Sequence, residues 1–176
     1  MPDPASGSAG ASGTSGAPDV GLDDLYRDIL LDHYRSPRNH GQLDERATHG
    51  ADGSNPLCGD ELRVELAVED GAIADVAIDG RGCSISQASA SMMSVYVRER
   101  GTDEALRAVE TFQQMMVAGE TPPEDFADIE ALMGVAKFPV RVKCASLAWK
   151  TLEQALTSSN GPESAVTTDE RSMGDD

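Results

Sequence analysis

The stretch Leu62-Arg63-Val64-Glu65-Leu66-Ala67-Val68-Glu69-Asp70-Gly71 places large apolar residues at alternate positions and then breaks at a turn signal. Such alternation is typical of a strand with one buried face. Val76 and Ile78 resume the apolar pattern after the turn, so the stretch predicts an antiparallel hairpin. Before it, residues 41–55 are rich in glycine and polar side chains, which leaves room for no more than a short, weak strand.

Helical periodicity lies on both sides of this hairpin. Before it, apolar residues and His33 fall on one helical face over residues 22–35, and Ser36-Pro37 ends the helix. After it, the helical period returns in four segments, which begin near Ser84, Thr102, Thr121 and Pro139. This order of elements predicts an α+β fold, with a small antiparallel β-sheet of about three strands packed against several α-helices.

The two ends of the chain differ in composition from its middle. Residues 1–20 are mostly Gly, Ser, Ala, Pro and Asp, and residues 159–176 are polar and acidic. Neither segment has enough apolar side chains to form a packed core. We therefore expect a disordered tail at 1–20, a single domain at 21–158 and a disordered acidic tail at 159–176.

The net charge is −17, because 31 acidic residues face only 14 Lys and Arg. Such a surface repels phosphate backbones and anionic lipid, so we expect neither nucleic acid nor a membrane as partner. The first 20 residues lack the cationic start and apolar stretch of a signal peptide. The three cysteines are far apart in the sequence, which favours a reducing cytoplasm over a disulfide framework.

Each of the three cysteines has neighbours that suit a metal-binding or reactive thiolate. Cys58 lies in the turn-rich stretch Asn55-Pro56-Leu57-Cys58-Gly59-Asp60, and Cys83 follows Gly80-Arg81-Gly82 just before a helix. Cys144 follows Pro139 within residues 137–150, which contain four cations and no acid. A helix N-terminus stabilises negative charge, and nearby cations lower the pKa of a thiol, so we expect Cys144 to favour the thiolate.

Three sulfurs and Asp60 can complete a four-ligand site for zinc. The spacing of the cysteines matches no short zinc-finger pattern, and by itself it favours three scattered core thiols, because a free cysteine often packs as a small apolar residue. We expect His33 to be a core or interface residue, and His40 and His49 to be solvated. Five methionines occupy helical core positions and are interpreted as packing: Met92, Met93, Met115, Met116 and Met133.

Several blocks of the sequence closely resemble the SufU branch of the IscU/NifU-type iron–sulfur cluster assembly proteins. The similarity covers residues 22–156, nearly all of the chain expected to fold. The blocks that carry it are Leu25-Tyr26-Arg27, Asp32-His33-Tyr34-Arg35-Ser36-Pro37-Arg38-Asn39-His40-Gly41, Asn55-Pro56-Leu57-Cys58-Gly59-Asp60, Gly82-Cys83-Ser84-Ile85-Ser86-Gln87-Ala88-Ser89-Ala90-Ser91-Met92-Met93 and Phe138-Pro139-Val140-Arg141-Val142-Lys143-Cys144-Ala145-Ser146-Leu147-Ala148-Trp149.

The resemblance implies that Cys58, Asp60, Cys83 and Cys144 converge at one exposed end of the domain and bind Zn²⁺. It also implies that Cys58 accepts persulfide sulfur from a SufS-like cysteine desulfurase, with Arg141 in a supporting role. In the IscU branch the same site assembles an iron–sulfur cluster, so a transient cluster or iron is the other expected cargo. Further implied partners are iron–sulfur scaffold proteins and apo-acceptor proteins. At most, the chain is a sulfurtransferase that acts with the desulfurase.

Two departures separate the chain from the IscU branch. Lys143 stands where that branch has a histidine, and Lys137-Phe138-Pro139 replaces its proline-rich chaperone-binding stretch. Both favour sulfur relay over long-lived cluster storage, and the scaffold role stays open. Two other functions are weighed: a purely structural zinc-binding domain and a cysteine-nucleophile hydrolase. The hydrolase needs a histidine beside one cysteine, and no block of the sequence has that arrangement.

Overall fold

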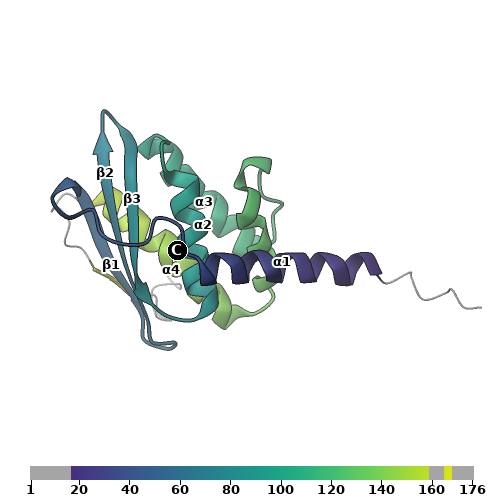
Figure 1. The fold of residues 1–176 in the computed structure, drawn as a ribbon. Coiled ribbons are helices and arrows are strands. Elements are labelled where there is room, and N and C mark those ends of the chain that lie inside the picture. Colours follow the sequence, from purple (N-terminus) through teal and green to yellow (C-terminus); the bar gives the residue numbers. More distant parts are fainter. Residues whose placement is uncertain (1–16, 159–164, 168–176) are drawn as a thin grey trace, which may run out of the picture.

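A computed structural model describes residues 17–158 and 165–167 as a twisted sheet with helices packed on one side (Figure 1). The sheet has the strand order β3-β2-β1-β4. Its first three strands are antiparallel neighbours: β1 (His49–Asn55), β2 (Asp60–Glu69) and β3 (Ala72–Arg81). The short strand β4 (Ala165–Thr167) runs parallel to β1 at the edge. The predicted antiparallel sheet is confirmed.

The predicted hairpin is formed by β2 and β3. Val64 pairs with Ile78 and Leu66 with Val76, so the alternating apolar side chains share one buried face. The turn between the strands places Asp70 at φ 51° and Gly71 at φ 77°, in the left-handed region that glycine adopts readily.

Strand β1 is longer than the weak strand expected from its composition. It pairs with β2 along all seven of its residues. Gly53 explains why a glycine-rich segment forms this strand, because a Cβ at this position would lie 2.1 Å from Thr151 Oγ1. The glycine therefore permits a close approach of the helix that contains Thr151, and this tertiary contact is not visible in the local sequence pattern.

The helices follow the predicted order with shifted ends: α1 (Ala17–Arg35), α2 (Ser84–Val97), α3 (Thr102–Ala118), the 3₁₀ segment η3 (Glu124–Val135) and α4 (Pro139–Thr157), with a 3₁₀ turn η2 (Asp44–Arg46) before the sheet. Helix α2 begins at Ser84 as predicted and ends at Val97. Helix α3 begins at Thr102 as predicted, with Gly101 at its N-cap position. Segment η3 breaks at Ala127 (φ 50°, ψ −118°), so it does not form the single short helix that was expected.

The predicted tails lie mostly outside the described residues. Within them, residues 17–20 belong to α1, and Ala165–Thr167 form β4. In the described part of the chain, no helix combines the length and apolar character needed to cross a membrane.

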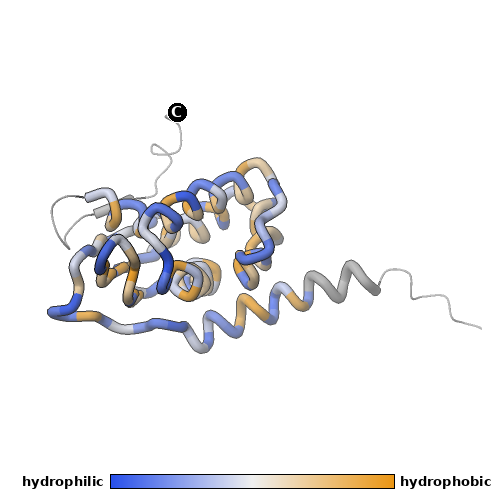
Figure 2. The backbone as a smooth tube through the Cα atoms, turned by 90° about the horizontal axis from the view of Figure 1, so that it is seen from above, coloured by the Kyte–Doolittle hydropathy of each residue, from blue (hydrophilic) through white to orange (hydrophobic). Residues whose placement is uncertain are grey.

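Helices α2 and α4 form the centre of the core. Trp149 of α4 stacks on Phe112 of α3, with ring centroids 4.5 Å apart, and its indole N–H donates to Ser89 Oγ of α2 at 3.1 Å. Along the helices, hydrophobic and hydrophilic residues alternate in Figure 2, as expected for helices with one buried face. Four of the five predicted packing methionines are buried, and the fifth is partly buried against the core: Met92, Met93, Met115, Met116 and Met133.

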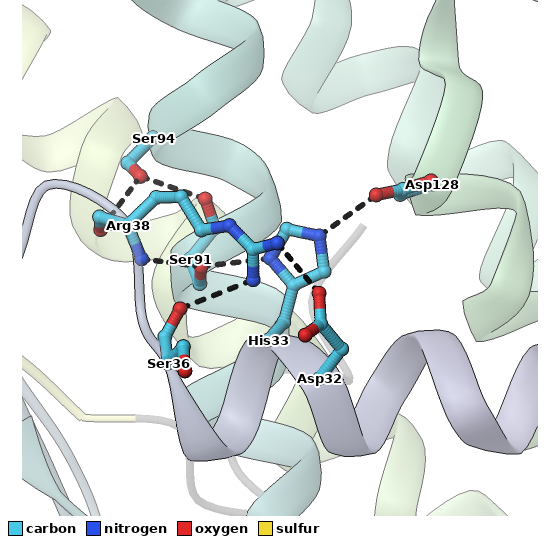
Figure 3. A network of polar contacts seen from close by, with 7 residues as sticks. All are labelled: Asp32, His33, Ser36, Arg38, Ser91, Ser94 and Asp128. Carbon is cyan, nitrogen blue, oxygen red and sulfur yellow. Dashed lines mark hydrogen bonds and ion pairs between the residues drawn. The ribbon is translucent and has the colours of Figure 1, made fainter.

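His33 joins three helical elements, as Figure 3 shows. Its Nδ1 lies 2.8 Å from Ser91 Oγ of α2, and its Nε2 lies 2.9 Å from Asp128 Oδ2 of η3. Because a carboxylate only accepts hydrogen bonds, Nε2 donates to Asp128. His33 is 3% exposed, which confirms the expectation of a core or interface histidine. Of the other two histidines, His40 is exposed, and His49 is half-buried with Nδ1 2.9 Å from Thr48 Oγ1.

Candidate metal centre

The predicted ligands lie where the ends of several elements meet. Cys58 is in the turn between β1 and β2, and Asp60 is the first residue of β2. Cys83 is the N-cap residue of α2, directly after β3, and Cys144 lies in the second turn of α4. These four residues are called the cysteine–aspartate site below.

Three of the four residues form a compact group. Cys58, Asp60 and Cys144 each place one ligand atom within 4.8 Å of the others, and the sulfurs of Cys58 and Cys144 are 3.3 Å apart. Cys83 lies beside this group, with its sulfur 3.9 Å from Asp60 Oδ2. In a tetrahedral zinc site with Zn–S bonds of about 2.3 Å, neighbouring ligands are about 3.8 Å apart. The donor types and these separations therefore fit a zinc ion after small side-chain adjustments.

Asn55 shapes the turn that presents Cys58. Its backbone carbonyl accepts the N–H groups of Cys58 (3.2 Å) and Gly59 (2.9 Å), and its side-chain Oδ1 accepts the N–H of Leu57 (3.2 Å). Gly59 has φ +70°, a conformation that glycine adopts without strain. Asn55 is almost fully buried, and it was not among the predicted site residues. Its place before Pro56, in a stretch typical of turns, was the available signal.

Asp60 connects the Cys58 turn to the start of α2. The carboxylate is 1% exposed, and its Oδ1 accepts the backbone N–H of Cys83 at 2.9 Å. This hydrogen bond leaves Oδ2 as the oxygen that faces the Cys83 sulfur. Gly82 makes the arrangement possible, because a Cβ at this position would lie 2.5 Å from Asp60 Oδ1.

Cys83 caps the N-terminus of α2 with its sulfur. The sulfur accepts the backbone N–H of Ser86 at 3.4 Å, which is the contact that an N-cap side chain makes. The unpaired N–H groups and the dipole at a helix N-terminus stabilise negative charge. The position predicted for Cys83 from its glycine-rich approach is therefore confirmed.

Cys144 is fully buried, and this changes its expected chemistry. Burial raises the pKa of the Cys144 thiol well above its ordinary value, and the contacts with Cys58 and Cys83 act in the same direction. The expectation that the basic residues 137–150 would favour a Cys144 thiolate is therefore wrong for the metal-free chain. The loss of hydration in the protein interior outweighs the nearby positive charge.

Arg141 is exposed and lies one helical turn before Cys144. A hydrogen bond with Cys144 raises the pKa of the Arg141 guanidinium, and negative charge at Cys83, Cys144 and Cys58 adds to this effect. Arg141 lines the same cavity as Cys58 and Cys83, and its supporting role stays a prediction. The guanidinium is placed to interact with negative charge that develops on the sulfurs.

An open cavity of about 570 Å³ lies in front of the site. Its lining consists of Cys58, Cys83, Phe138, Pro139, Val140 and Arg141. Three large apolar side chains are exposed at or next to this cavity: Leu57 (62%), Phe138 (58%) and Val140 (59%). Leu57 and the lining residues Phe138 and Val140 are called the apolar rim. Exposed apolar groups beside a reactive centre are typical of a surface that binds another protein.

The described structure argues against a hydrolase. A Ser–His–Asp chain exists, since Ser91, His33 and Asp128 are linked in series (Figure 3), but Ser91 is fully buried. Its hydroxyl oxygen also accepts the backbone N–H of Arg38 at 2.9 Å. A substrate cannot reach this hydroxyl, and in the described chain no histidine hydrogen-bonds to a cysteine. The chain of hydrogen bonds therefore holds α1, α2 and η3 together.

Comparison with known proteins agrees with the fold and the site. The sequence profile described as "NifU-like N terminal domain" matches residues 25–161. The zinc-dependent sulfurtransferase SufU of Bacillus subtilis is 43% identical over 141 residues, which cover 80% of this chain and 95% of that protein. The iron–sulfur cluster assembly scaffold protein IscU of Streptococcus pyogenes is 39% identical over 78% of this chain and 86% of that protein.

A solved structure gives the same result for the fold. The SUF-system iron–sulfur cluster assembly scaffold protein of Fervidobacterium islandicum superposes with a TM-score of 0.69 at 34% sequence identity, covering 74% of this chain and 95% of that chain. The fold and the cysteine–aspartate site thus define an iron–sulfur cluster assembly protein of the scaffold and sulfurtransferase class. The chain belongs to the NifU-like N-terminal domain family, which includes SufU and IscU.

Proposed function

We propose that this chain accepts persulfide sulfur from a cysteine desulfurase at a zinc site formed by Cys58, Asp60, Cys83 and Cys144. One observation carries the proposal: the ligand atoms of Cys58, Asp60 and Cys144 lie within 4.8 Å of one another beside an open cavity. The B. subtilis relative is named as a zinc-dependent sulfurtransferase, which supports zinc and sulfur transfer for this chain as well. A reducing cytoplasm suits the three free thiols.

Zinc fits the proposed site because three soft sulfurs and one carboxylate are a donor set that this ion accepts. When bound, zinc would keep the sulfurs deprotonated and would hold them in place until a partner displaces one of them. The single carboxylate ligand, Asp60, would contribute only Oδ2, because Oδ1 accepts the Cys83 N–H. Asp60 would therefore be the weakest point of the site and would make the metal exchangeable.

Cys58 is the proposed sulfur acceptor. It is half-buried and it lines the open cavity. Cys144 is fully buried, and the Cys83 sulfur is engaged by the first turn of α2. Arg141 would stabilise negative charge on the sulfur during exchange.

The apolar rim is the proposed contact for the desulfurase. A partner that delivers sulfur must bring its own reactive cysteine into the cavity, which Phe138 and Val140 of the rim line. Burying exposed apolar side chains on docking would supply binding free energy, since about 25 cal/mol is gained per Å² of apolar surface. The chain would then pass the sulfur to a scaffold protein or to an apo-acceptor.

A second candidate function is that of a scaffold on which an iron–sulfur cluster forms. The IscU relative of S. pyogenes, named as a scaffold, is 39% identical, so the comparisons support this role too. Lys143 at the position before Cys144 favours relay, because an ammonium group cannot replace a histidine as a metal ligand. A purely structural zinc-binding domain is the remaining alternative.

The test is metal analysis of the full chain, followed by mixing with a cysteine desulfurase and cysteine. Relay predicts stoichiometric zinc, faster desulfurase turnover and a persulfide on Cys58, and Cys58→Ala should lose the persulfide and the faster turnover. Scaffolding predicts a coloured cluster after iron is added. A structural domain predicts tightly held zinc with no change in desulfurase turnover. If Cys58→Ala still accepts sulfur at the normal rate, the acceptor assignment is wrong.

A further inference from the structure

Cys144 lies behind Cys58 as seen from the open cavity. Cys58 lines the cavity, whereas Cys144 is fully buried and does not contribute to the lining. The two sulfurs are nevertheless in contact, 3.3 Å apart. Cys58 therefore has the cavity on one side and the Cys144 sulfur on the side toward the core.

This arrangement has a consequence for a persulfide on Cys58. Sulfur that arrives through the cavity bonds to Cys58 on the cavity side, so the outer sulfur points away from Cys144. Exchange at sulfur needs the attacking sulfur to approach opposite the bond that breaks. Cys144 Sγ lies 3.3 Å from Cys58 Sγ and outside the cavity lining, which puts it within reach of the inner sulfur from the side toward the core.

We propose that Cys144 is the resolving cysteine, whose sulfur attacks Cys58 Sγ of the persulfide and expels the outer sulfur as hydrogen sulfide. The proposal rests on the proposed function, because it requires a persulfide on Cys58. It applies when Cys144 is not held by a metal ion. Its product differs from that of simple relay, since free sulfide is the form in which sulfur enters an iron–sulfur cluster.

The step balances without an added reductant. The bond between Cys58 Sγ and the outer sulfur breaks, and a bond between Cys58 Sγ and Cys144 Sγ forms. The outer sulfur leaves with the electron pair of the broken bond and takes up the proton of the Cys144 thiol. The two electrons that reduce the outer sulfur come from the cysteine sulfurs, which end as a disulfide. A dithiol reductant must then open the disulfide before the next cycle.

Cys83 is not the resolving cysteine in this geometry. Its sulfur accepts the Ser86 N–H at 3.4 Å and faces Asp60 Oδ2 at 3.9 Å, so it is engaged by other groups. The Cys144 sulfur is directed by a contact with the carbonyl of Val140 at 3.6 Å and by Cys58 itself. The short distance of 3.3 Å between the Cys58 and Cys144 sulfurs therefore favours their disulfide over the two pairings that include Cys83.

The test is a single turnover with the full chain after its zinc has been removed with a chelator, so that no metal ion holds Cys144. The chain is mixed with equimolar cysteine desulfurase and equimolar cysteine, without a thiol reductant, and quenched with acid and an alkylating agent. Free sulfide is measured, and a non-reducing peptide map locates persulfide and disulfide. Cys144→Ser removes the resolving thiol. Ser146→Ala is the matched control, a buried polar residue of the same helix that lies outside the cysteine–aspartate site.

The expected result is one sulfide released for each Cys58–Cys144 disulfide, in the unaltered chain and in Ser146→Ala. Cys144→Ser should keep the extra sulfur on Cys58 and lose the sulfide release. A persulfide that stays on Cys58 in the unaltered chain, or a disulfide that includes Cys83, overturns the proposal even if Cys144→Ser fails to fold. Absence of any sulfur on Cys58 in every variant, with no disulfide, would instead refute the proposed acceptor function.

Discussion

The Asp60 carboxylate and the backbone N–H of Cys83 are joined by a buried hydrogen bond of 2.9 Å, between residues that are far apart in the sequence. One carboxylate oxygen is thereby used to hold the start of α2 against the start of β2. The other oxygen is left for the site. A structural role and a proposed ligand role therefore belong to the same side chain, and substitutions can separate them.

Asp60→Asn and Asp60→Ala should have different effects on the zinc-depleted chain. Asparagine can still accept the Cys83 N–H, whereas alanine leaves this buried donor unpaired, at a cost of about 1–3 kcal/mol. Urea unfolding of the two variants without zinc measures this difference. Both variants should exchange zinc faster than the unaltered chain, which a competing chelator would report. Equal unfolding midpoints for the two variants would show that the hydrogen bond contributes little to stability.

Gly82→Ala should weaken zinc binding by displacing Asp60. The new Cβ would lie 2.5 Å from Asp60 Oδ1, so the carboxylate must move. Disturbing a group that orients a metal ligand typically lowers affinity about 10–100-fold. Gly134→Ala is the matched control, because a Cβ there has nothing within 4 Å. Zinc affinities from chelator competition should fall for Gly82→Ala alone, and a similar fall for both variants would contradict this account.

Gly53→Ala should destabilise the whole domain by about 1–3 kcal/mol through overpacking. The added methyl group would meet Thr151 Oγ1 at 2.1 Å and Leu147 Cδ1 at 3.0 Å. Thermal unfolding measures the loss, and the second substitution Thr151→Ala should recover part of it by making room. No recovery in the double variant would mean that the backbone conformation of Gly53, and not the contact with α4, sets the requirement.

The zinc-depleted chain should lose stability as the pH rises above about 9. The folded state raises the pKa of Cys144 above its ordinary value of 9.0, so above that pH the unfolded chain releases a proton that the folded chain retains. Unfolding is then favoured, by at most about 1.4 kcal/mol per pH unit. Urea unfolding at several pH values measures the slope. Cys144→Ser should flatten it, because serine does not titrate in this range.

Ser91 and Asp128 both hydrogen-bond to His33, but they should contribute differently to the free energy of unfolding. Ser91→Ala leaves the buried His33 Nδ1 and the part-buried N–H of Arg38 without their partner and should cost about 1–3 kcal/mol. Asp128→Ala removes a carboxylate that is 54% exposed, so the loss should stay below about 1 kcal/mol. Thermal unfolding of both variants makes the comparison. A larger loss for Asp128→Ala would indicate that η3 depends on this single contact.

Local sequence patterns predicted most of the fold because the hairpin and the helices are encoded by short-range periodicity. The β2–β3 hairpin and the start of α4 at Pro139 are examples. Strand β1 was underestimated, since Gly53 is required by the close approach of α4, which the local propensity of the strand does not show. The break at Ala127 and the pairing of β4 with β1 depend on tertiary contacts that no local pattern shows.

The proposed ligands were found from the sequence because each cysteine has an unusual neighbourhood and because the blocks resemble a known family. The supporting residues were harder to find. Asn55 acts through its backbone carbonyl and a buried side chain, and Gly82 acts through the space it leaves. The ionisation of Cys144 was misjudged, because the sequence shows nearby cations but not the depth of burial.

Strand β4 has a practical consequence for shortening this chain. Residues 165–167 pair with β1 at what would otherwise be an open margin of the sheet. A chain cut after Thr157 would expose unpaired amide and carbonyl groups of β1 along Asp52–Ser54. An exposed edge strand of this kind can pair with the same strand of another molecule. Self-association of a truncated chain would then reflect the lost strand, and should not be taken for the native oligomeric state.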